Sequence, residues 1–142
     1  MPVGGRLERS DTSLFGAACR EAEEESGLSP ILEETILLAV VENIHRDGPD
    51  RNRRMYWFMG SFHGIPRAYP DEGMTDPQAY SLMRLPRSEM WPADERWLFP
   101  VLRNYELNPQ MPLHQQRYFY EHGSLQEHEP LDVTITLPVF PR

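Results

Sequence analysis

Four glutamates crowd one short segment, CREAEEESGL at 19–28, and a glycine follows them. On a helix, residues three and four positions apart are neighbours, so Glu21, Glu24 and Glu25 share one face while Glu23 points elsewhere. Three carboxylates on one face disfavour each other's ionised forms. A hard cation such as Mg²⁺, or alternatively Mn²⁺, relieves that repulsion. The segment is therefore a candidate metal site, and the plain alternative is a solvated helix face.

Arg20 stands beside these acids. It lies three residues before Glu23 and four before Glu24, so its planar guanidinium can hold a carboxylate in place. The surrounding pattern predicts a helix at 13–26. Candidate N-caps lie at 10–13, and Gly27 is placed as a C-cap. The alternative is again an exposed helix with a salt-bridging arginine.

The remaining segments indicate an α+β fold with a mixed, largely antiparallel sheet. We expect strands at 35–45, 54–63 and 78–84, a helix at 92–105 with a break at Pro100, a polar linker at 108–115, and a closing hairpin of 117–121 with 132–137.

Length and charge limit the function classes. The chain has 142 residues, which predicts a single domain over 1–142. Its formal net charge is −8. Such a charge repels polyanions, so we expect no nucleic-acid polymer and no anionic membrane as a partner. The single cysteine, Cys19, excludes an intrachain disulfide. With no apolar run of about 18 residues and no secretory signal, the expected location is the cytoplasm, with the nucleus or a mitochondrion as alternatives.

The stretch 4–28 resembles the Nudix box, a pattern of Gly, five residues, Glu, seven residues, and Arg-Glu-hydrophobic-x-Glu-Glu-x-Gly-hydrophobic. The matching residues are Gly5, Arg20, Glu21, Ala22, Glu24, Glu25, Gly27 and Leu28. Asp11 stands at the position of the first glutamate, and eight residues instead of seven separate it from Arg20.

The resemblance implies a Nudix-like α/β/α sandwich that hydrolyses a nucleoside diphosphate linked to a variable group, with Mg²⁺. Arg20, Glu21, Glu24 and Glu25 would be catalytic, and the three glutamates would hold the metal together with the backbone of Gly5. Which glutamate is the base stays open. The family adds an acid from a later loop. The ungapped match there is Met74, and a small loop shift would bring in Glu72, close to Asp71; the alternative is an exposed turn.

A second motif, EMWPADERWLFP at 89–100, is similar to that of the MutT-like oxidised-purine nucleoside triphosphatases, which hydrolyse 8-oxo-dGTP and 2-hydroxy-dATP. The resemblance implies that Trp91 stacks on the base and that Asp94 binds its polar edge. The alternatives are a core aromatic and a helix cap. Ala93 departs from the family, which has a second aspartate there.

The family has some 30 residues before the glycine pair, whereas this chain begins at MPVGG. We therefore expect an N-terminally truncated domain. The missing strands could be lost, supplied by another chain, or replaced by a rearranged sheet. The expected function is Mg²⁺-dependent hydrolysis of nucleoside triphosphates, oxidised purine nucleotides among them, to monophosphate and pyrophosphate, in sanitation of the nucleotide pool. The alternatives are a Nudix hydrolase for another nucleoside diphosphate derivative and an inactive Nudix-fold binding protein. The oligomeric state stays open.

Overall fold

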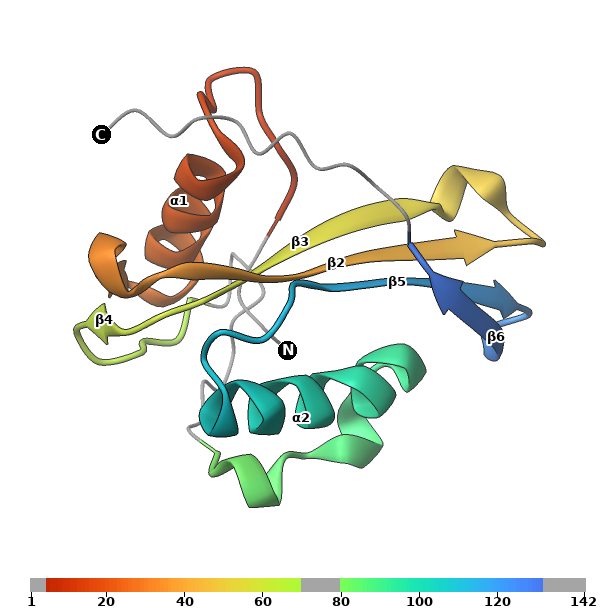
Figure 1. Cartoon of the computed structure of the whole chain (residues 1–142). Helices are drawn as coiled ribbons and strands as arrows, with labels where there is room; N and C mark the ends of the chain where they lie inside the picture. Colours follow the sequence, from red (N-terminus) through yellow and green to blue (C-terminus); the bar gives the residue numbers. More distant parts are fainter. Residues whose placement is uncertain (1–4, 70–79, 132–142) are drawn as a thin grey trace. The chain divides into compact units, whose positions relative to one another are not determined.

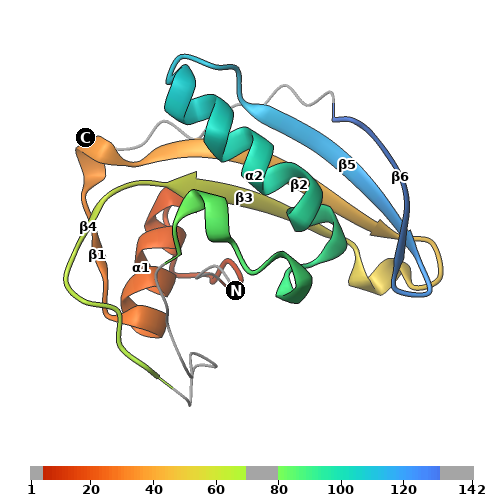
Figure 2. The same ribbon diagram turned by 90° about the horizontal axis from the view of Figure 1, so that it is seen from below.

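A computed structural model describes residues 5–69 and 80–131. Its helices and strands are α1 (Leu14–Ser26), β1 (Ser29–Pro30), β2 (Ile36–His45), β3 (Arg53–Met59), β4 (Phe62–His63), α2 (Pro92–Leu107), β5 (His114–Glu121) and β6 (Ser124–Pro130). Figure 1 labels all of them except β1, which is labelled in Figure 2. Short 3-10 turns form at Leu32–Glu34, Pro49–Arg51, Leu82–Arg84 and Arg87–Glu89. The described residues divide into two compact units, the first of 5–37 and 58–69, the second of 38–57 and 80–131.

In the first unit, α1 begins and ends where its sequence predicts. Ser13 precedes the first turn, and its hydroxyl accepts the Gly16 N–H at 2.9 Å. Gly27 ends the helix in the left-handed region, with φ 69°, and its N–H donates to a carbonyl of the last turn at 2.9 Å. Phe15 meets Phe58 edge-on, with 5.6 Å between ring centroids. These contacts fix both ends of the helix that carries the acidic face.

The sheets are mixed in direction. The larger sheet has the strand order β3-β2-β5-β6, in which β2 runs parallel to β5 and β5 antiparallel to β6. β2 and β3 are neighbours joined only by residues 46–52, which is too short for a parallel crossover, so this pair is antiparallel. β1 and β4 form a separate antiparallel pair. The prediction of an α+β fold with a mixed sheet is confirmed.

The core of the second unit lies under α2. Figure 2 shows α2 lying along β2 and β5. Its buried side chains Ala93, Trp97 and Val101 recur every four residues and so form one stripe. Trp97 packs edge-on against Trp57, with 5.0 Å between ring centroids, and stacks on His114 at 5.1 Å. These contacts fix α2, and the residues before it, against the strands.

One charged residue of β2 is also buried. Glu42 is 8% exposed and accepts from the Arg54 guanidinium at 2.7 and 3.1 Å and from Arg117 at 3.4 Å. Arg117 in turn donates to Glu129 at 2.9 Å. Burial opposes the charge on Glu42, but the two guanidinium groups outweigh it and lower its pKa. The charges thus alternate across β3, β2, β5 and β6.

The predicted helix break at Pro100 is wrong. α2 continues through Pro100 and ends at Leu107, two residues beyond the predicted end. A proline inside a helix costs roughly 3 kcal/mol because it removes a hydrogen bond and clashes with the preceding turn. The buried side chains of Trp97 and Val101, on either side of Pro100, outweigh that cost.

Several strand boundaries also differ from the prediction. Residues 82–84 form a 3-10 turn instead of a strand, and 78–79 lie outside the described residues. The strand predicted at 54–63 is divided at Gly60, between β3 and β4. β5 begins inside the predicted polar linker and pairs with β6, whereas 132–137 lies outside the described residues. None of the described helices has the length and apolar character needed to cross a membrane.

Candidate functional site

Arg20 connects the acidic face of α1 to the loop before it. Its Nη1 donates to Glu21 Oε1 and to Glu24 Oε2, each at 2.9 Å. Its Nε and Nη2 each meet one oxygen of Asp11 at 3.0 Å, which forms a bidentate ion pair. Nη2 also donates to the Arg6 carbonyl at 3.2 Å. The guanidinium therefore sets the positions of two of the predicted metal ligands.

Asp11 is itself held by the loop. The Glu8 N–H donates to Asp11 Oδ2 at 2.7 Å, and the Asp11 N–H donates back to the Glu8 carbonyl at 3.1 Å. The Arg20 guanidinium, helped by the Glu8 amide, lowers the pKa of Asp11. Asp11 is also the main cause of a raised pKa at Arg20. The pair stays ionised at neutral pH, so the orientation of Arg20 is fixed.

The main partner of Arg20 differs from the one that helical spacing predicts. Spacing predicts Glu23 or Glu24, and Glu24 is confirmed. Asp11, which lies nine residues earlier, takes both remaining arms of the guanidinium. Spacing along a helix says nothing about a loop that folds back on it. The available signal was that Asp11 stands at an acidic position of the Nudix pattern.

The carboxyl group of Glu21 lies directly against Gly5. A Cβ at position 5 would overlap the carboxyl carbon and both oxygens of Glu21. Any larger residue here would therefore displace the carboxylate or the loop. The structure thus brings together Gly5 and Glu21, two members of the predicted metal set.

Two further predicted ligands are Glu25 and Glu72. Glu25 is partly buried on α1, and Glu72 lies outside the described residues. Within 5–69 and 80–131, no three His, Cys, Asp or Glu side chains are grouped to hold a metal ion. Mg²⁺ commonly uses only one or two carboxylates and completes its shell with water and phosphate oxygens. The oxygens of Glu21 and Glu24, held at one arginine nitrogen, suit that requirement.

The second unit carries the predicted base-binding residues. Trp91 lies immediately before α2 and is 57% exposed, which excludes the alternative of a core aromatic. Its indole is accessible to a ligand. Asp94 lies in the first turn of α2 but is 8% exposed. The structure therefore places an accessible aromatic side chain and a buried carboxyl group three residues apart.

Asp94 does not cap the helix. Its Oδ1 accepts the indole N–H of Trp97 at 3.1 Å, and the N-cap position belongs to Trp91, which makes no side-chain capping bond. Burial raises the pKa of Asp94, and the Trp97 hydrogen bond offsets part of that effect. Such a carboxyl group takes up a proton more readily than an exposed one, so it can both accept and donate hydrogen bonds.

Two tyrosines of β5 lie near Asp94. The backbone N–H of Ala93 donates to the Tyr120 hydroxyl at 3.2 Å. Burial, with a contribution from the charge of Asp94, raises the pKa values of Tyr118 and Tyr120, so both hydroxyl groups stay protonated. Ala93 is fully buried. Asp94 therefore has phenolic hydroxyl groups in its electrostatic environment, a feature that the sequence analysis missed.

The second unit also contains buried polar atoms without a hydrogen-bond partner among the described residues. In the second unit, five buried side-chain atoms have no hydrogen-bond partner among the described residues: Asn43 Oδ1, His45 Nδ1, Trp57 Nε1, His114 Nε2 and Gln115 Oε1. Buried polar groups are nearly always hydrogen-bonded, so such atoms need a partner beyond the described residues, such as water, a ligand or another part of the chain. Asn43 and His45 pair in register with Tyr118 and Tyr120. Sequence reasoning missed these residues because three different strands supply them.

The comparison with protein families agrees with the resemblance to the Nudix box. The Nudix domain model matches residues 2–100, which include α1 and the beginning of α2. Every site residue predicted from the sequence falls in that range, Glu72 included. No curated protein matches the chain. Because the match covers well over half of the 142 residues, the chain belongs to the Nudix family.

Proposed function

We propose that this chain hydrolyses nucleoside triphosphates, oxidised purine nucleotides foremost, to a monophosphate and pyrophosphate. Nudix hydrolases act on nucleotide derivatives, and the Nudix match spans residues 2–100. The proposal rests chiefly on the Arg20 guanidinium, one nitrogen of which holds both Glu21 and Glu24. The proposed role is sanitation of the nucleotide pool in the cytoplasm.

The acidic face supplies the chemistry of the diphosphate bond. Glu21, Glu24 and Glu25 would hold Mg²⁺, or alternatively Mn²⁺, beside the backbone of Gly5. The cation, when bound, neutralises phosphate oxygens and makes a bound water more acidic. One glutamate accepts the proton of the attacking water. Arg20 keeps Glu21 and Glu24 in place and is itself oriented by Asp11.

The second unit supplies the selection of the base. The exposed indole of Trp91 offers a face for stacking. Asp94 offers a carboxyl group whose pKa is raised by burial, which suits hydrogen bonds to the N–H and carbonyl groups on the edge of a purine. We assign Trp91 and Asp94 to base binding on these two properties.

A turnover assay tests the reaction. The purified chain is incubated with Mg²⁺ and a panel of nucleotides that includes 8-oxo-dGTP, dGTP, a dinucleoside polyphosphate and a nucleotide sugar. We expect monophosphate and pyrophosphate from the triphosphates. Glu24→Gln should lower kcat by about 10²- to 10⁴-fold, the range for losing a base or metal ligand. Glu23→Gln is the matched control, because Glu23 is exposed on the same helix and lies off the Arg20 cluster.

The panel also decides between the alternatives. If only the dinucleoside polyphosphate or the nucleotide sugar were hydrolysed, the chain would be a Nudix hydrolase for another nucleoside diphosphate derivative. Quenching of tryptophan fluorescence by nucleotides without any turnover would favour a binding protein. Equal rates for the wild type and Glu24→Gln would contradict the assignment of the acidic face.

Ala93→Asp tests the base site separately. It introduces the second aspartate found in the MutT-like oxidised-purine nucleoside triphosphatases. The ratio of kcat/KM for 8-oxo-dGTP to that for dGTP should therefore rise, by about 10-fold for one charged hydrogen bond. Because Ala93 is fully buried, the variant should also be less stable. The ratio is therefore measured well below the thermal midpoint of the variant. An unchanged or lowered ratio would count against this assignment.

A further inference from the structure

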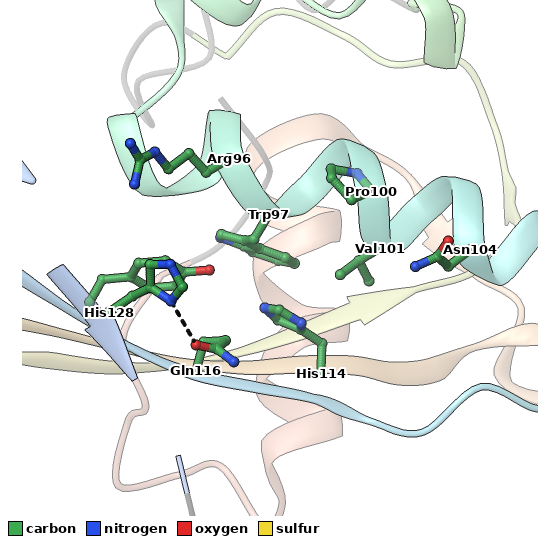
Figure 3. Close-up of a pocket in the computed structure, with 9 residues that line it drawn as sticks. Arg96, Trp97, Pro100, Val101, Asn104, His114, Gln116 and His128 are labelled. Carbon is green, nitrogen blue, oxygen red and sulfur yellow. Dashed lines mark hydrogen bonds between the residues drawn. The ribbon is translucent and has the colours of Figure 1, made fainter. Parts of the chain in front are cut away.

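The second unit contains a cavity that the proposed function does not use. It has a volume of about 320 Å³ and lies between α2 and the strands β5 and β6 (Figure 3). Its walls include Arg96, Trp97 and Asn104 from α2, His114 and Gln116 from β5, and His128 from β6. Trp91 and Asp94 are not among the residues that line it. Trp97 lines the cavity and donates to Asp94, so the cavity borders the proposed base site without including Trp91 or Asp94 in its walls.

The cavity is long and has two different ends. Arg96 and Asn104 are eight residues apart on α2 and both line it, which corresponds to a length of about 12 Å along the helix. Figure 3 shows Arg96 and His128 toward one end, and Asn104 with His114 toward the other. A ligand that fills this space is elongated, with one end beside the guanidinium.

The ionisable side chains of the described residues that line the cavity include an arginine and histidines but no acids. No aspartate or glutamate is among the residues that line the cavity. The Arg96 side chain makes no ion pair and no hydrogen bond with any residue of 5–69 or 80–131, whereas the side chains of Arg20, Arg54 and Arg117 are all paired with carboxylates. In a chain of net charge −8, a guanidinium with no carboxylate partner among the described residues, at a cavity that no described acid lines, favours an anionic ligand.

Polar groups deeper in the cavity also lack partners. His114 Nε2 is buried without a hydrogen-bond partner among the described residues, and burial lowers the pKa of this imidazole, so it is neutral at pH 7. Gln116 Oε1 is engaged by His128 Nδ1 at 3.3 Å, which leaves the amide N–H groups of Gln116 as donors. Trp97, stacked on His114, supplies an apolar wall. The lining thus combines the Gln116 amide and a His114 ring nitrogen that has no partner among the described residues with an aromatic surface.

We propose that this cavity is a second binding site, for a small organic anion. The anionic head lies beside Arg96 and His128, and the apolar body extends along Trp97 toward Asn104. The positive charge of Arg96 selects the anionic head of the ligand, because a guanidinium binds carboxylate or phosphate oxygens with two donors. The proposal does not depend on the hydrolytic activity.

Matched probes test the site. The ¹⁵N-labelled full chain is titrated with 3-phenylpropionate, with phenyl phosphate, and with the uncharged 3-phenylpropanol, and its NMR spectra are followed. We expect both anions to shift the amide resonances of Val101, Asn104 and Gln116, and the alcohol to bind about tenfold more weakly or worse. A preference for one anion supports the site and identifies its head group as carboxylate or phosphate.

Two variants locate the charge. Arg96→Gln should weaken both anions about tenfold or more. Arg103→Gln is the control, because Arg103 is exposed on α2 and does not line the cavity. Equal affinities of the two variants, or of the anions and the alcohol, would overturn the proposal. So would shifts confined to α1 or to residues 91–94, or no shifts at millimolar concentrations of either anion.

Discussion

At Arg20, one planar group donates to Asp11, Glu21 and Glu24, and the fixed fork of the guanidinium decides where these carboxylates lie. Asp11 uses both of its oxygens on Arg20 and is held in turn by the Glu8 amide. This chain of contacts explains how like charges tolerate one another on one helix face. Arg20 is a positioning residue in this account, because it acts through the glutamates.

Arg20→Lys tests that role. Lysine keeps the charge but has no planar fork, so it cannot bridge Asp11 and both glutamates. We expect kcat/KM to fall about 10- to 100-fold, the usual effect of losing a group that orients metal ligands. The apparent affinity for Mg²⁺ should fall with it. Arg9→Lys, in the same exposed loop, is the control. A variant with normal Mg²⁺ affinity and normal kcat/KM would show that charge alone suffices.

Asp94→Asn separates stability from recognition. The folded-state pKa of Asp94 lies above the ordinary value of 3.8, so the ionised carboxylate destabilises the fold at neutral pH. That cost disappears as the pH falls through the raised pKa, because the folded chain then binds the proton. Asparagine keeps an oxygen for the Trp97 N–H and carries no charge. We therefore expect a higher thermal midpoint than the wild type at pH 7 and a smaller difference in acid.

The same variant should lose purine preference in the turnover assay. A carboxyl group can accept or donate a hydrogen bond at either oxygen, whereas the asparagine amide accepts only at its oxygen and donates only at its nitrogen. Thermal unfolding across pH and the ratio of kcat/KM values measure the two effects independently. A midpoint difference that grows in acid would contradict the raised pKa. An unchanged purine preference would remove Asp94 from the base site.

Among the elements, α1 was the most predictable. Ser13, Gly27 and the apolar spacing define its ends from local sequence, and the structure agrees within one residue. Gly27 has φ 69°, and a Cβ there would lie 3.1 Å from the Tyr69 hydroxyl oxygen. The glycine therefore serves both the backbone turn and the close approach of Tyr69.

Gly27→Ala should lower the free energy of unfolding by about 1–2 kcal/mol, since a side chain is strained in the left-handed region. Gly123→Ala is the matched control, because Gly123 has φ 77° and nothing lies within 4 Å of its would-be Cβ. Denaturant unfolding of both variants measures the difference. If Gly27→Ala cost less than Gly123→Ala, the contact with Tyr69 would not restrict position 27.

The strands show where local sequence fails. His122 and Gly123, with φ values of 49° and 77°, form the turn that pairs β5 with β6. This signal for a two-residue turn is present in the sequence but weaker than a typical Asn-Gly. The parallel pairing of β2 with β5 has no local signal at all, because its paired residues, such as Ala39 and His114, are 75 positions apart. Pairing of that kind depends on tertiary packing.

Across the whole chain, the two motifs were readable from sequence because each is carried by one helix or its first turn. Arg20, the glutamates and Trp91 lie where short-range spacing could identify them. The environment of Asp94 could not be predicted in this way, since Tyr118 and Tyr120 come from β5, a strand more than 20 residues further along the chain. The predictions of a single domain, of a truncated beginning, and of Glu72 as a ligand stay predictions.

The central claim is that the acidic face of α1 binds a divalent cation. Titration of the chain with Mn²⁺, followed by electron paramagnetic resonance with and without nucleotide, tests it most directly. The account predicts binding by the wild type and by Glu23→Gln, competed by Mg²⁺, and an affinity about tenfold lower or worse for Glu24→Gln. Equal affinity in Glu24→Gln, or no bound ion in either condition, would contradict it.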